Sequence, residues 1–347
     1  MVKTLKVRRA DAEKAKQFLL EKSWLDKTRI IGKTELMYII LSVNEKADLE
    51  LLKKKFAGSK IEVKNMPFLP PVPGNLKELL KSVVPEKYLD KVIKSYDVVG
   101  DIAILEVPKE IENFDVAIAH ALKRANPYIK TVVRKAGKIG TEFRLRPLKH
   151  LTGEKRTTTL HKEHGVALHI DISKAYFSTR SSGERFRIAN LVKPDEEVLV
   201  MFAGIGVYAL IIAKIQPRVR IWAIEKNPEA VKYMEQNIRA TPAGHAVTPI
   251  LGDVSEKVPE LGIKFDRIIM PYPEKAKDFL ELAFKYVKPH GVIHYYSFVH
   301  EKDVEKHINE IEKIAKKQGK SIEIQNWRKA GSFAPRVWRM VFDILVD

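Results

Sequence analysis

The C-terminal half of the chain predicts an α/β domain with a seven-stranded, mostly parallel sheet. From about Ile188, short apolar segments alternate with segments whose apolar residues recur at helical spacing, as in successive strand–helix units. Five such units and a terminal hairpin give the expected strands: Val198–Phe202, Val219–Ile224, Val247–Leu251, Arg267–Met270, Val292–Ser297, Ile322–Trp327 and Val337–Val346.

The turn after the first of these strands has the residues of a nucleoside-cofactor site. Ala203-Gly204-Ile205-Gly206 joins the strand to an apolar helix, and glycines at such a turn let a ligand approach the backbone closely. The next strand ends in Glu225, and an acid there can accept hydrogen bonds from both ribose hydroxyls. A further acid, Asp253, follows the third strand. We therefore expect a cofactor at the carboxyl edge of the sheet.

Two cofactors fit this turn. Gly204-x-Gly206-x-x-Ala209 matches the loose dinucleotide pattern GxGxxG/A, which leaves NAD as an alternative. Phe202-Ala-Gly-x-Gly, followed by Glu225-x-Asn-Pro, more closely resembles class I S-adenosylmethionine methyltransferases. In that family an acid placed like Asp253 holds the adenine. S-adenosylmethionine is therefore the expected cofactor, and no metal is expected.

Composition predicts a polyanionic partner. The formal net charge of the 347 residues is +18, and phosphate contacts are the commonest use of such a surplus. The basic clusters lie largely outside the cofactor segment, at Lys130–Lys138, Arg144/Arg146/Lys149, Lys155/Arg156 and Arg180/Arg185/Arg187. The chain has no cysteine, which excludes disulfides, thiolate zinc sites and cysteine nucleophiles.

Location and source follow from other parts of the composition. No apolar run reaches membrane-spanning length and the first residues do not form a signal peptide, so a cytoplasmic protein is expected. Charged residues make up 31% of the chain, which is typical of a thermophilic source.

The first boundary along the chain is the segment Met66–Gly74, which contains four prolines and predicts a stiff, extended linker. Residues 1–64 before it predict a small α/β module: a helix around 12–19, a strand at Leu36–Val43, a helix at Leu49–Phe56 and a strand at Ile61–Val63. The expected domains are 1–64, a linker at 65–75, 76–170 and 171–347.

Residues 76–170 predict a basic α+β domain. Asn75 can cap a first helix, and two strands, Tyr96–Val99 and Ile102–Val107, follow it. A helix is expected at about Phe114–Ala125, then short strands rich in Thr, Val and Arg, and a hairpin at His161–Gly165.

Six segments resemble the archaeal and eukaryotic tRNA (guanine-N1)-methyltransferases that modify position 37. The resemblance covers residues 76–347 and is looser before them, where the family has an extra tRNA-binding domain. The matching segments are Glu142-Phe-Arg-Leu-Arg146, His150–Glu154 with Thr157–Gly165, Tyr176-Phe-Ser-Thr-Arg180, Gly183-Glu-Arg185, Met201-Phe-Ala-Gly-Ile-Gly206 and His294-Tyr-Tyr296.

The resemblance implies two catalytic residues. Glu184 corresponds to the family's general base, which removes the proton from guanine N1. Arg144 corresponds to the arginine that holds guanine O6 and stabilises the charge developing there. The structural alternatives are an ion pair between Glu184 and Arg185 or Arg187, and a phosphate contact by Arg144.

The resemblance and the strand ends together imply the remaining site. Residues 1–64 become a tRNA-docking module and residues 76–170 an RNA-binding domain of a monomeric enzyme. Cofactor-binding residues are expected to be Tyr176, Arg180, Phe202, Gly204, Gly206, Glu225, Lys226, Asp253, Val254, Met270 and Pro271. Substrate-binding residues are expected to be Arg134, Arg146, Lys155, Arg156, Arg185, Tyr272 and Pro273. His294, Tyr295 and Tyr296 are expected in the core.

Two departures from the family pattern leave the reaction open. Pro271 stands where the family usually has an asparagine that contacts the target base, and Val200 stands where it often has aspartate. Methyl transfer to N1 of guanosine 37 is the leading hypothesis. The alternative is a wybutosine-pathway step on the same nucleotide, by aminocarboxypropyl transfer or C7 methylation of the tricyclic intermediate. A non-catalytic tRNA-binding protein is a third possibility.

Overall fold

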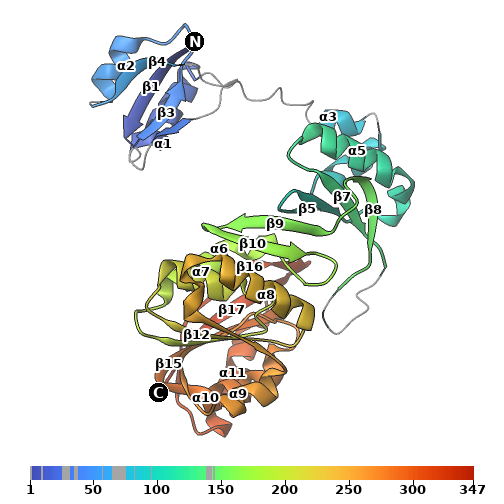
Figure 1. Ribbon diagram of the computed structural model, residues 1–347, viewed down its shortest axis with the longest axis vertical. Coiled ribbons are helices and arrows are strands. Elements are labelled where there is room, and N and C mark those ends of the chain that lie inside the picture. Colours follow the sequence, from blue (N-terminus) through green and yellow to red (C-terminus); the bar gives the residue numbers. More distant parts are fainter. Residues whose placement is uncertain are drawn as a thin grey trace. The chain divides into compact units, whose positions relative to one another are not determined.

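The computed structural model describes residues 2–8, 11–25, 32–34, 38–56, 58–64, 76–81, 83–94, 96–137, 143 and 145–347 (Figure 1). The predicted linker at 65–75 lies outside these residues. The chain divides into two compact units, one of 1–79 with 124–126 and one of 80–123 with 127–347.

The N-terminal unit is a four-stranded sheet with two helices. Its elements are β1 (Val2–Arg8), α1 (Ala12–Glu21), β2 (Gly32–Thr34), β3 (Tyr38–Ser42), α2 (Leu49–Lys55) and β4 (Lys60–Lys64), with strand order β2-β3-β1-β4. Both helices and the strands β3 and β4 were predicted. The central strand β1 was not, because its lysines obscure the apolar residues, although Leu5 and Val7 are fully buried.

The second unit begins with a four-stranded sheet of order β5-β6-β7-β8. From residue 76 to the end of this sheet, the elements are α3 (Leu76–Lys81), α4 (Leu89–Lys94), β5 (Tyr96–Val99), β6 (Ile102–Leu105), α5 (Asp115–Ala125), β7 (Thr131–Lys135) and β8 (Leu148–Gly153). The pair β6–β7 is parallel and the other two pairs are antiparallel. The predicted pair of strands and the helix at Phe114–Ala125 are confirmed.

A hairpin of β9 (Thr158–Glu163) and β10 (Val166–Asp171) follows. His164 and Gly165 both have positive φ, as a two-residue turn between twisted strands requires. Val166, Leu168 and Ile170 are buried in the core of the C-terminal sheet domain. The hairpin thus packs with the C-terminal domain, although the expected boundary at 170/171 assigned it to the middle one.

The C-terminal domain contains the predicted seven-stranded sheet. Its strands are β11 (Glu197–Met201), β12 (Arg220–Glu225), β13 (Val247–Leu251), β14 (Phe265–Met270), β15 (Val287–His300), β16 (Ile322–Ala334) and β17 (Val337–Val346). Their order is β13-β12-β11-β14-β15-β17-β16. The strands from β13 to β15 run parallel, whereas β17 is antiparallel to both of its neighbours. All seven predicted strands are confirmed.

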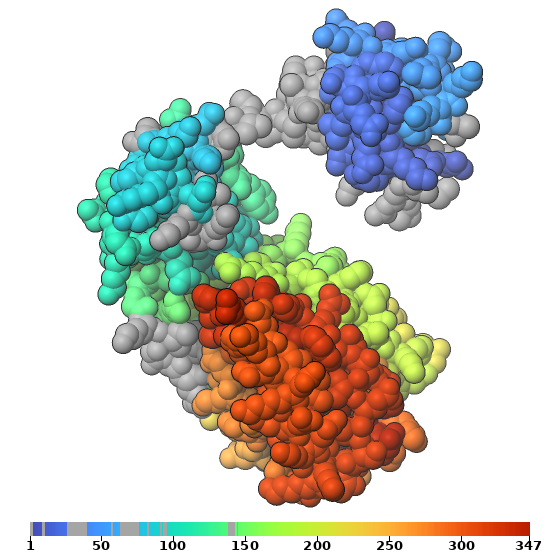
Figure 2. All heavy atoms as spheres, turned by 180° about the vertical axis from the view of Figure 1, so that it is seen from behind, coloured from blue at the N-terminus to red at the C-terminus, as the bar shows by residue number. Residues whose placement is uncertain are grey.

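Helices cover both faces of this sheet. In the space-filling view the atoms of the C-terminal half, coloured from yellow-green to red, adjoin one another (Figure 2). The helices are α6 (Ser182–Leu191), α7 (Val207–Ile215), α8 (Pro228–Ala240), α9 (Val254–Leu261), α10 (Leu280–Tyr286) and α11 (Val304–Lys317). The core on one face includes residues of α6, α7 and α8, and the core on the other includes residues of α9, α10 and α11. None of the helices in the described ranges has the length and apolar character needed to cross a membrane.

Two features of this sheet locate a ligand site. The strand order reverses between β11 and β14, since β12 and β13 lie on one side of β11 and β14 and β15 lie on the other. A crevice forms at the carboxyl ends of parallel strands at such a reversal. The glycine turn after β11 opens into this crevice, as the sequence predicts.

Candidate active site

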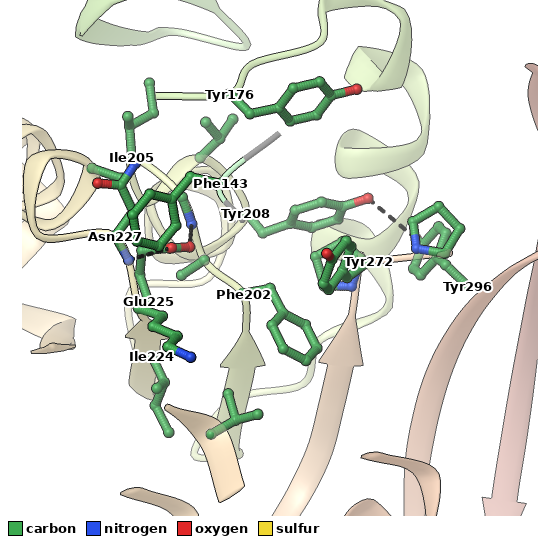
Figure 3. Close-up of a pocket in the computed structure, with 18 of the residues that line it drawn as sticks. Phe143, Tyr176, Phe202, Ile205, Tyr208, Ile224, Glu225, Asn227, Tyr272 and Tyr296 are labelled. Carbon is green, nitrogen blue, oxygen red and sulfur yellow. Dashed lines mark hydrogen bonds between the residues drawn. The ribbon is translucent and has the colours of Figure 1, made fainter. Parts of the chain in front are cut away.

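A cavity of about 320 Å³ lies at the carboxyl ends of β11, β12 and β14 (Figure 3). Both aromatic and charged side chains line it. From the expected site, the residues that line it are Tyr176, Arg185, Phe202, Gly204, Glu225, Lys226, Asp253, Val254, Pro271, Tyr272 and Pro273. The structure therefore brings together most of the expected cofactor residues and three of the expected substrate residues.

The glycine turn needs its glycines for two different reasons. Gly204 has a φ of 57° and its backbone lines the cavity. Gly206 has a φ of 85° and begins α7, and a Cβ atom on it would lie 2.8 Å from Met234 Cγ. Gly206 does not line the cavity. Its role is to let the turn pack against α8, so it positions Gly204 without facing the ligand site.

Glu225 is tied to this turn by its carboxylate. One oxygen, Oε2, accepts a hydrogen bond from the Gly204 amide at 2.8 Å, and Oε1 accepts one from the Asn227 amide at 2.8 Å. Burial raises the pKa of Glu225, and the amide hydrogen bonds act in the opposite direction. Figure 3 shows Glu225 with both of these bonds beside the cavity. The carboxylate is thus held at one orientation with unused lone pairs for two hydroxyl donors.

Asp253 follows β13 and caps α9. Its Oδ1 accepts hydrogen bonds from the Ser255 amide at 2.9 Å and the Ser255 hydroxyl at 2.7 Å. Lys226 Nζ lies 3.3 Å from its Oδ2. Burial alone would raise the pKa of Asp253, but the Ser255 hydrogen bonds and the Lys226 ammonium lower it. The ligand site therefore has a charged acceptor at the end of a second strand.

Two other expected cofactor residues lie off the cavity. Met270 is fully buried in the core beneath it. The Arg180 side chain is largely exposed and pairs with Asp97 at 2.8 Å. Met270 supports the crevice from below, and Arg180 joins the segment before α6 to strand β5.

Glu184 is buried on α6 and is held by two neighbours. Its carboxylate accepts three hydrogen bonds from the Arg187 guanidinium at 2.7 to 3.1 Å and one from the Tyr296 hydroxyl at 2.8 Å. The ion pair with Arg187 is one of the structural alternatives considered for this residue. Arg185 pairs instead with Glu163. Tyr296 lines the cavity, so Glu184 lies one side chain behind the cavity wall.

A buried polar network continues from Glu184 across the sheet. Arg187 donates to both Asp343 oxygens at 2.7 and 3.0 Å, and Asp343 Oδ1 lies 2.6 Å from His294 Nδ1. Arg267 Nη1 lies 2.7 Å from His294 Nε2. Since arginine only donates, His294 Nε2 accepts and the proton is on Nδ1. His294 is therefore a neutral link between Arg267 and Asp343.

The titration of this network agrees with that arrangement. Burial lowers the pKa of His294, although the hydrogen bond to Asp343 acts in the opposite direction. Burial would raise the pKa of Asp343, but the hydrogen bonds from His294 and Arg187 lower it below its usual range. Burial also raises the pKa of Tyr296 well above its ordinary value, so its hydroxyl stays protonated and donates to Glu184. His294, Tyr295 and Tyr296 are all buried, as predicted.

Most expected substrate-binding cations are paired within the protein. Arg134 pairs with Glu112 and lies 3.3 Å from Asp115, and Arg146 lies 3.2 Å from Glu106. Arg156 pairs with Asp101 and Glu154, and Arg185 is buried against Glu163. Lys155 is exposed. The expected catalytic residue Arg144 lies outside the described residues.

Several lining residues were not predicted from the sequence. They are Phe143, Phe177, Ser178, Ser181, Ile205, Tyr208, Asn227, Phe279, Phe298 and Arg339, among others. Phe298 and Arg339 come from the long strands β15 and β17, which pair antiparallel with each other, and both lie outside the matching motif segments. One signal could have found Phe298: it follows Tyr296 by two positions on a strand, and such residues share one face.

A nucleoside-sized crevice at the reversal point of a seven-stranded sheet with an antiparallel β17 defines a class I, Rossmann-like methyltransferase. The chain belongs to the TRM5/TYW2 methyltransferase family. The family model described as "TRM5/TYW2 methyltransferase domain" matches residues 159–324, and "TYW2 N-terminal domain" matches residues 76–157. The family predicted from the sequence motifs is confirmed.

The chain is similar to curated proteins with two related activities. It is 37% identical to tRNA (guanine(37)-N(1))-methyltransferase Trm5b of Pyrococcus abyssi, over 79% of this chain and 81% of the relative. It is 32% identical to Trm5b of Methanocaldococcus jannaschii, over 99% of this chain and 98% of the relative. It is also 36% identical to the tRNA(Phe) (4-demethylwyosine(37)-C(7)) aminocarboxypropyltransferase of M. jannaschii, over 72% of this chain and 96% of the relative.

The solved structures that are similar to this chain also include both Trm5 and TYW2 proteins. The crystal structure of Trm5b from P. abyssi has a TM-score of 0.72 at 32% identity and covers both chains fully. A complex of aTrm5 with tRNALeu has a TM-score of 0.71 at 32% identity, covering 99% of each chain. The structure of M. jannaschii TYW2 with AdoMet has a TM-score of 0.57 at 30% identity, covering 73% of this chain and 99% of that one.

Proposed function

We propose that this protein transfers the methyl group of S-adenosylmethionine to N1 of guanosine 37 in tRNA. The observation that carries the proposal is that one cavity is lined by the Gly204–Glu225 cofactor turn and by Tyr296, whose hydroxyl donates to Glu184 directly behind the cavity wall. The two Trm5b relatives match this chain over most of their length and are named for this reaction. The AdoMet-bound and tRNA-bound structures of relatives support the cofactor and the substrate.

The residues at the cavity fit an adenosyl group. Glu225 is fixed by two amides and presents acceptors for the ribose hydroxyls. Gly204 has no side chain, so its backbone can contact a flat or bulky ligand directly. Asp253 offers a carboxylate for an exocyclic amino group. When bound, S-adenosylmethionine would supply an electrophilic methyl group, and Tyr176, Tyr208 and Tyr296 line the same cavity.

On the base side, Glu184 would accept the proton of guanine N1. Arg187 and the Tyr296 hydroxyl hold its carboxylate at a defined place directly behind Tyr296 in the cavity wall. A carboxylate held within reach of the N1 proton raises the nucleophilicity of that nitrogen as the methyl group arrives. Arg144 is proposed to hold O6 on the strength of the family resemblance.

The rest of the chain would hold the tRNA. We propose residues 1–64 as a docking module, and the expected domains 76–170 and 171–347 as the RNA-binding and methyltransferase domains, with the β9–β10 hairpin belonging by its packing to the latter. The net charge of +18 supports contacts to the phosphate backbone. We also infer that the enzyme is a cytoplasmic monomer, because one chain supplies both the expected cofactor residues of the cavity and Tyr296, which contacts the base candidate Glu184.

One experiment tests the reaction. The protein is incubated with unmodified tRNA and S-adenosylmethionine, and the nucleoside and the spent cofactor are identified by mass spectrometry. We expect 1-methylguanosine at position 37 and S-adenosylhomocysteine. Absence of any transfer by a protein that binds both ligands would return the chain to a non-catalytic tRNA-binding role.

A second reaction on the same nucleotide is favoured by one specific observation. Pro271 lines the cavity where the family usually has an asparagine, so a side-chain amide that could contact guanine is absent. The similarity to the aminocarboxypropyltransferase of M. jannaschii also favours a second reaction on this nucleotide. Methylthioadenosine as the spent cofactor would establish aminocarboxypropyl transfer, and methylation at C7 of the tricyclic base would establish the other wybutosine step.

A further inference from the structure

The hairpin of β16 and β17 carries an exposed aromatic residue directly beside the cavity. Phe298 of β15 lines the cavity, and Phe333 of β16 stacks on it with ring centroids 3.8 Å apart and ring planes at 23°. Phe333 itself does not line the cavity and its side chain is 58% exposed. One face of the Phe333 ring is therefore covered by Phe298, and the ring remains largely open to solvent.

The position of this pair relative to Glu184 follows from strand geometry. Tyr296 and Phe298 are two residues apart on β15, so both side chains are on one face of the sheet. Tyr296 contacts Glu184, and Phe298 is the next residue on that face toward the carboxyl end of β15. Phe333 reaches Phe298 from β16, across the intervening strand β17. A polynucleotide whose target base lies in the cavity beside Tyr296 and Phe298 would thus have a neighbouring nucleotide close to Phe333.

The charge of the hairpin suits a polynucleotide. Residues 326–340 contain four cationic side chains and no acidic one. Arg328 lies directly opposite Val341, so it is on the face of Tyr296 and Phe298. Arg328 and Arg336 are exposed, and neither side chain forms an ion pair with another residue in the described part of the chain. Exposed guanidinium groups on the same surface element as an exposed ring are a typical combination for binding single-stranded nucleic acid.

Arg339 joins the hairpin to the catalytic segment. Its Nη1 donates to Ser181 Oγ at 2.8 Å, and its Nη2 donates to the Ala330 carbonyl at 2.6 Å. Ser181 immediately precedes α6, the helix that carries Glu184. Ser181, Phe298 and Arg339 all line the cavity. The Phe333 ring is therefore presented by a hairpin that is fixed to the cavity wall.

We propose that Phe333, backed by Phe298 and carried on the same hairpin as the exposed Arg328 and Arg336, binds the RNA nucleotide adjacent to the target guanosine. The base of that nucleotide stacks on the open face of Phe333, and its phosphates face the two arginines. This inference rests on the proposed function, because it takes RNA as the substrate at the cavity. Stacking on an aromatic ring is tolerant of base identity, so the platform holds the loop without choosing its sequence.

The test uses the full chain with S-adenosylhomocysteine and a full-length tRNA carrying 2-aminopurine on the 5′ or the 3′ side of the target. We expect the bound probe at one of these two positions to be more strongly quenched by the native protein than by Phe333→Ala. The affinity for tRNA should fall about tenfold or more in Phe333→Ala, and Phe333→Trp should restore both properties.

Trp327→Ala is the matched control. Trp327 is 47% exposed on the same strand, but it lies opposite Phe342, which packs in the core on the other face of the sheet. Trp327→Ala should therefore leave tRNA binding and quenching unchanged. Equal quenching and affinity in the native protein and Phe333→Ala would overturn the proposal, as would the absence of quenching by the native protein at both flanking positions. These readouts do not use methyl transfer, so they separate this inference from the proposed reaction.

Discussion

The two sides of the cavity are built in different ways. The cofactor side consists of Gly204, Glu225 and Asp253, each at the end of a parallel strand and each held by backbone amides or a neighbouring side chain. The base side depends on buried side chains from α6, β15 and β17, which hold one another through hydrogen bonds and ion pairs. Backbone geometry fixes the first side, whereas the second depends on a buried polar network whose members must all be present.

The largest effect is expected on the base side. Glu184→Gln should slow methyl transfer by about a hundredfold or more, because an amide cannot accept the N1 proton. Single-turnover kinetics with saturating tRNA measure this step directly. The affinities for tRNA and S-adenosylmethionine should change little, since Arg187 keeps its partner Asp343.

The thermal midpoint of Glu184→Gln controls for a structural role. A variant with a native rate and a strongly lowered midpoint would make Glu184 only the ion-pair partner of Arg187. Partial recovery of the rate at higher pH would support the role as a base, because hydroxide then helps to remove the N1 proton.

The next largest effect is expected on the cofactor side. Glu225→Ala removes a carboxylate that accepts from Gly204 and Asn227 and would accept from the ribose. Hydrogen bonds to a charged group contribute about 1.5–3 kcal/mol each, so S-adenosylmethionine affinity should fall about tenfold or more. Calorimetry with EDTA present measures it. Unchanged affinity, or preferential binding of NAD, would contradict the assignment of this side.

The same contrast explains what the sequence could predict. Gly204, Glu225 and Asp253 stand at strand ends that hydrophobic periodicity locates, so local sequence is enough to bring them together. Phe298 and Arg339 reach the cavity only because β15 and β17 pair in one register. That register depends on the whole sheet. The partners of Arg134, Arg146 and Arg156 could not be predicted either, because an ion pair between distant residues leaves no periodic signal.

The fold itself was predictable where elements are long and apolar. All seven strands of the C-terminal sheet were expected from their residues. The central strand β1 of the N-terminal unit was missed because Lys3 and Lys6 interrupt its apolar residues. Its pairing with β3 and β4 places it between two neighbours, where tertiary contacts outweigh its weak local pattern.

A smaller effect is expected on the pH dependence of stability. The pKa of His294 in the folded protein is lower than the ordinary histidine value. As the pH falls below about 6.5, the unfolded chain therefore binds a proton at this histidine before the folded protein does. The stabilisation from neutral His294 is complete above that pH and is lost as the pH falls. We expect the free energy of unfolding to decrease by about 1 kcal/mol per pH unit across that range.

His294→Asn is the variant that isolates this contribution. Its side-chain amide can still donate to Asp343 but does not titrate. Denaturant unfolding at a series of pH values should show a shallower decline between about pH 7 and 5 in the variant. Some decline should remain, because burial also lowers the pKa of His307. An identical dependence of the free energy of unfolding on pH in both proteins would show that the titration of His294 does not contribute to the loss of stability in acid.

The smallest effect is expected at Pro271, where the two sides of the cavity meet. Proline provides a carbonyl acceptor but no side-chain amide, so Pro271→Asn restores a donor that the family usually has. Tyr272 packs edge-on against Phe202, with ring centroids 5.1 Å apart, and this contact holds the segment whichever residue precedes it.

Methyl transfer needs the base, the O6 contact and alignment with the cofactor, none of which depends on Pro271. We therefore expect Pro271→Asn to keep N1 methylation within a few-fold of the native rate and to release the same product. Tyr272→Ala, in contrast, should be measurably impaired if the ring also stacks on the target base. A Pro271→Asn variant that gains N1 methylation absent from the native protein would show that the native enzyme performs a different reaction on this nucleotide.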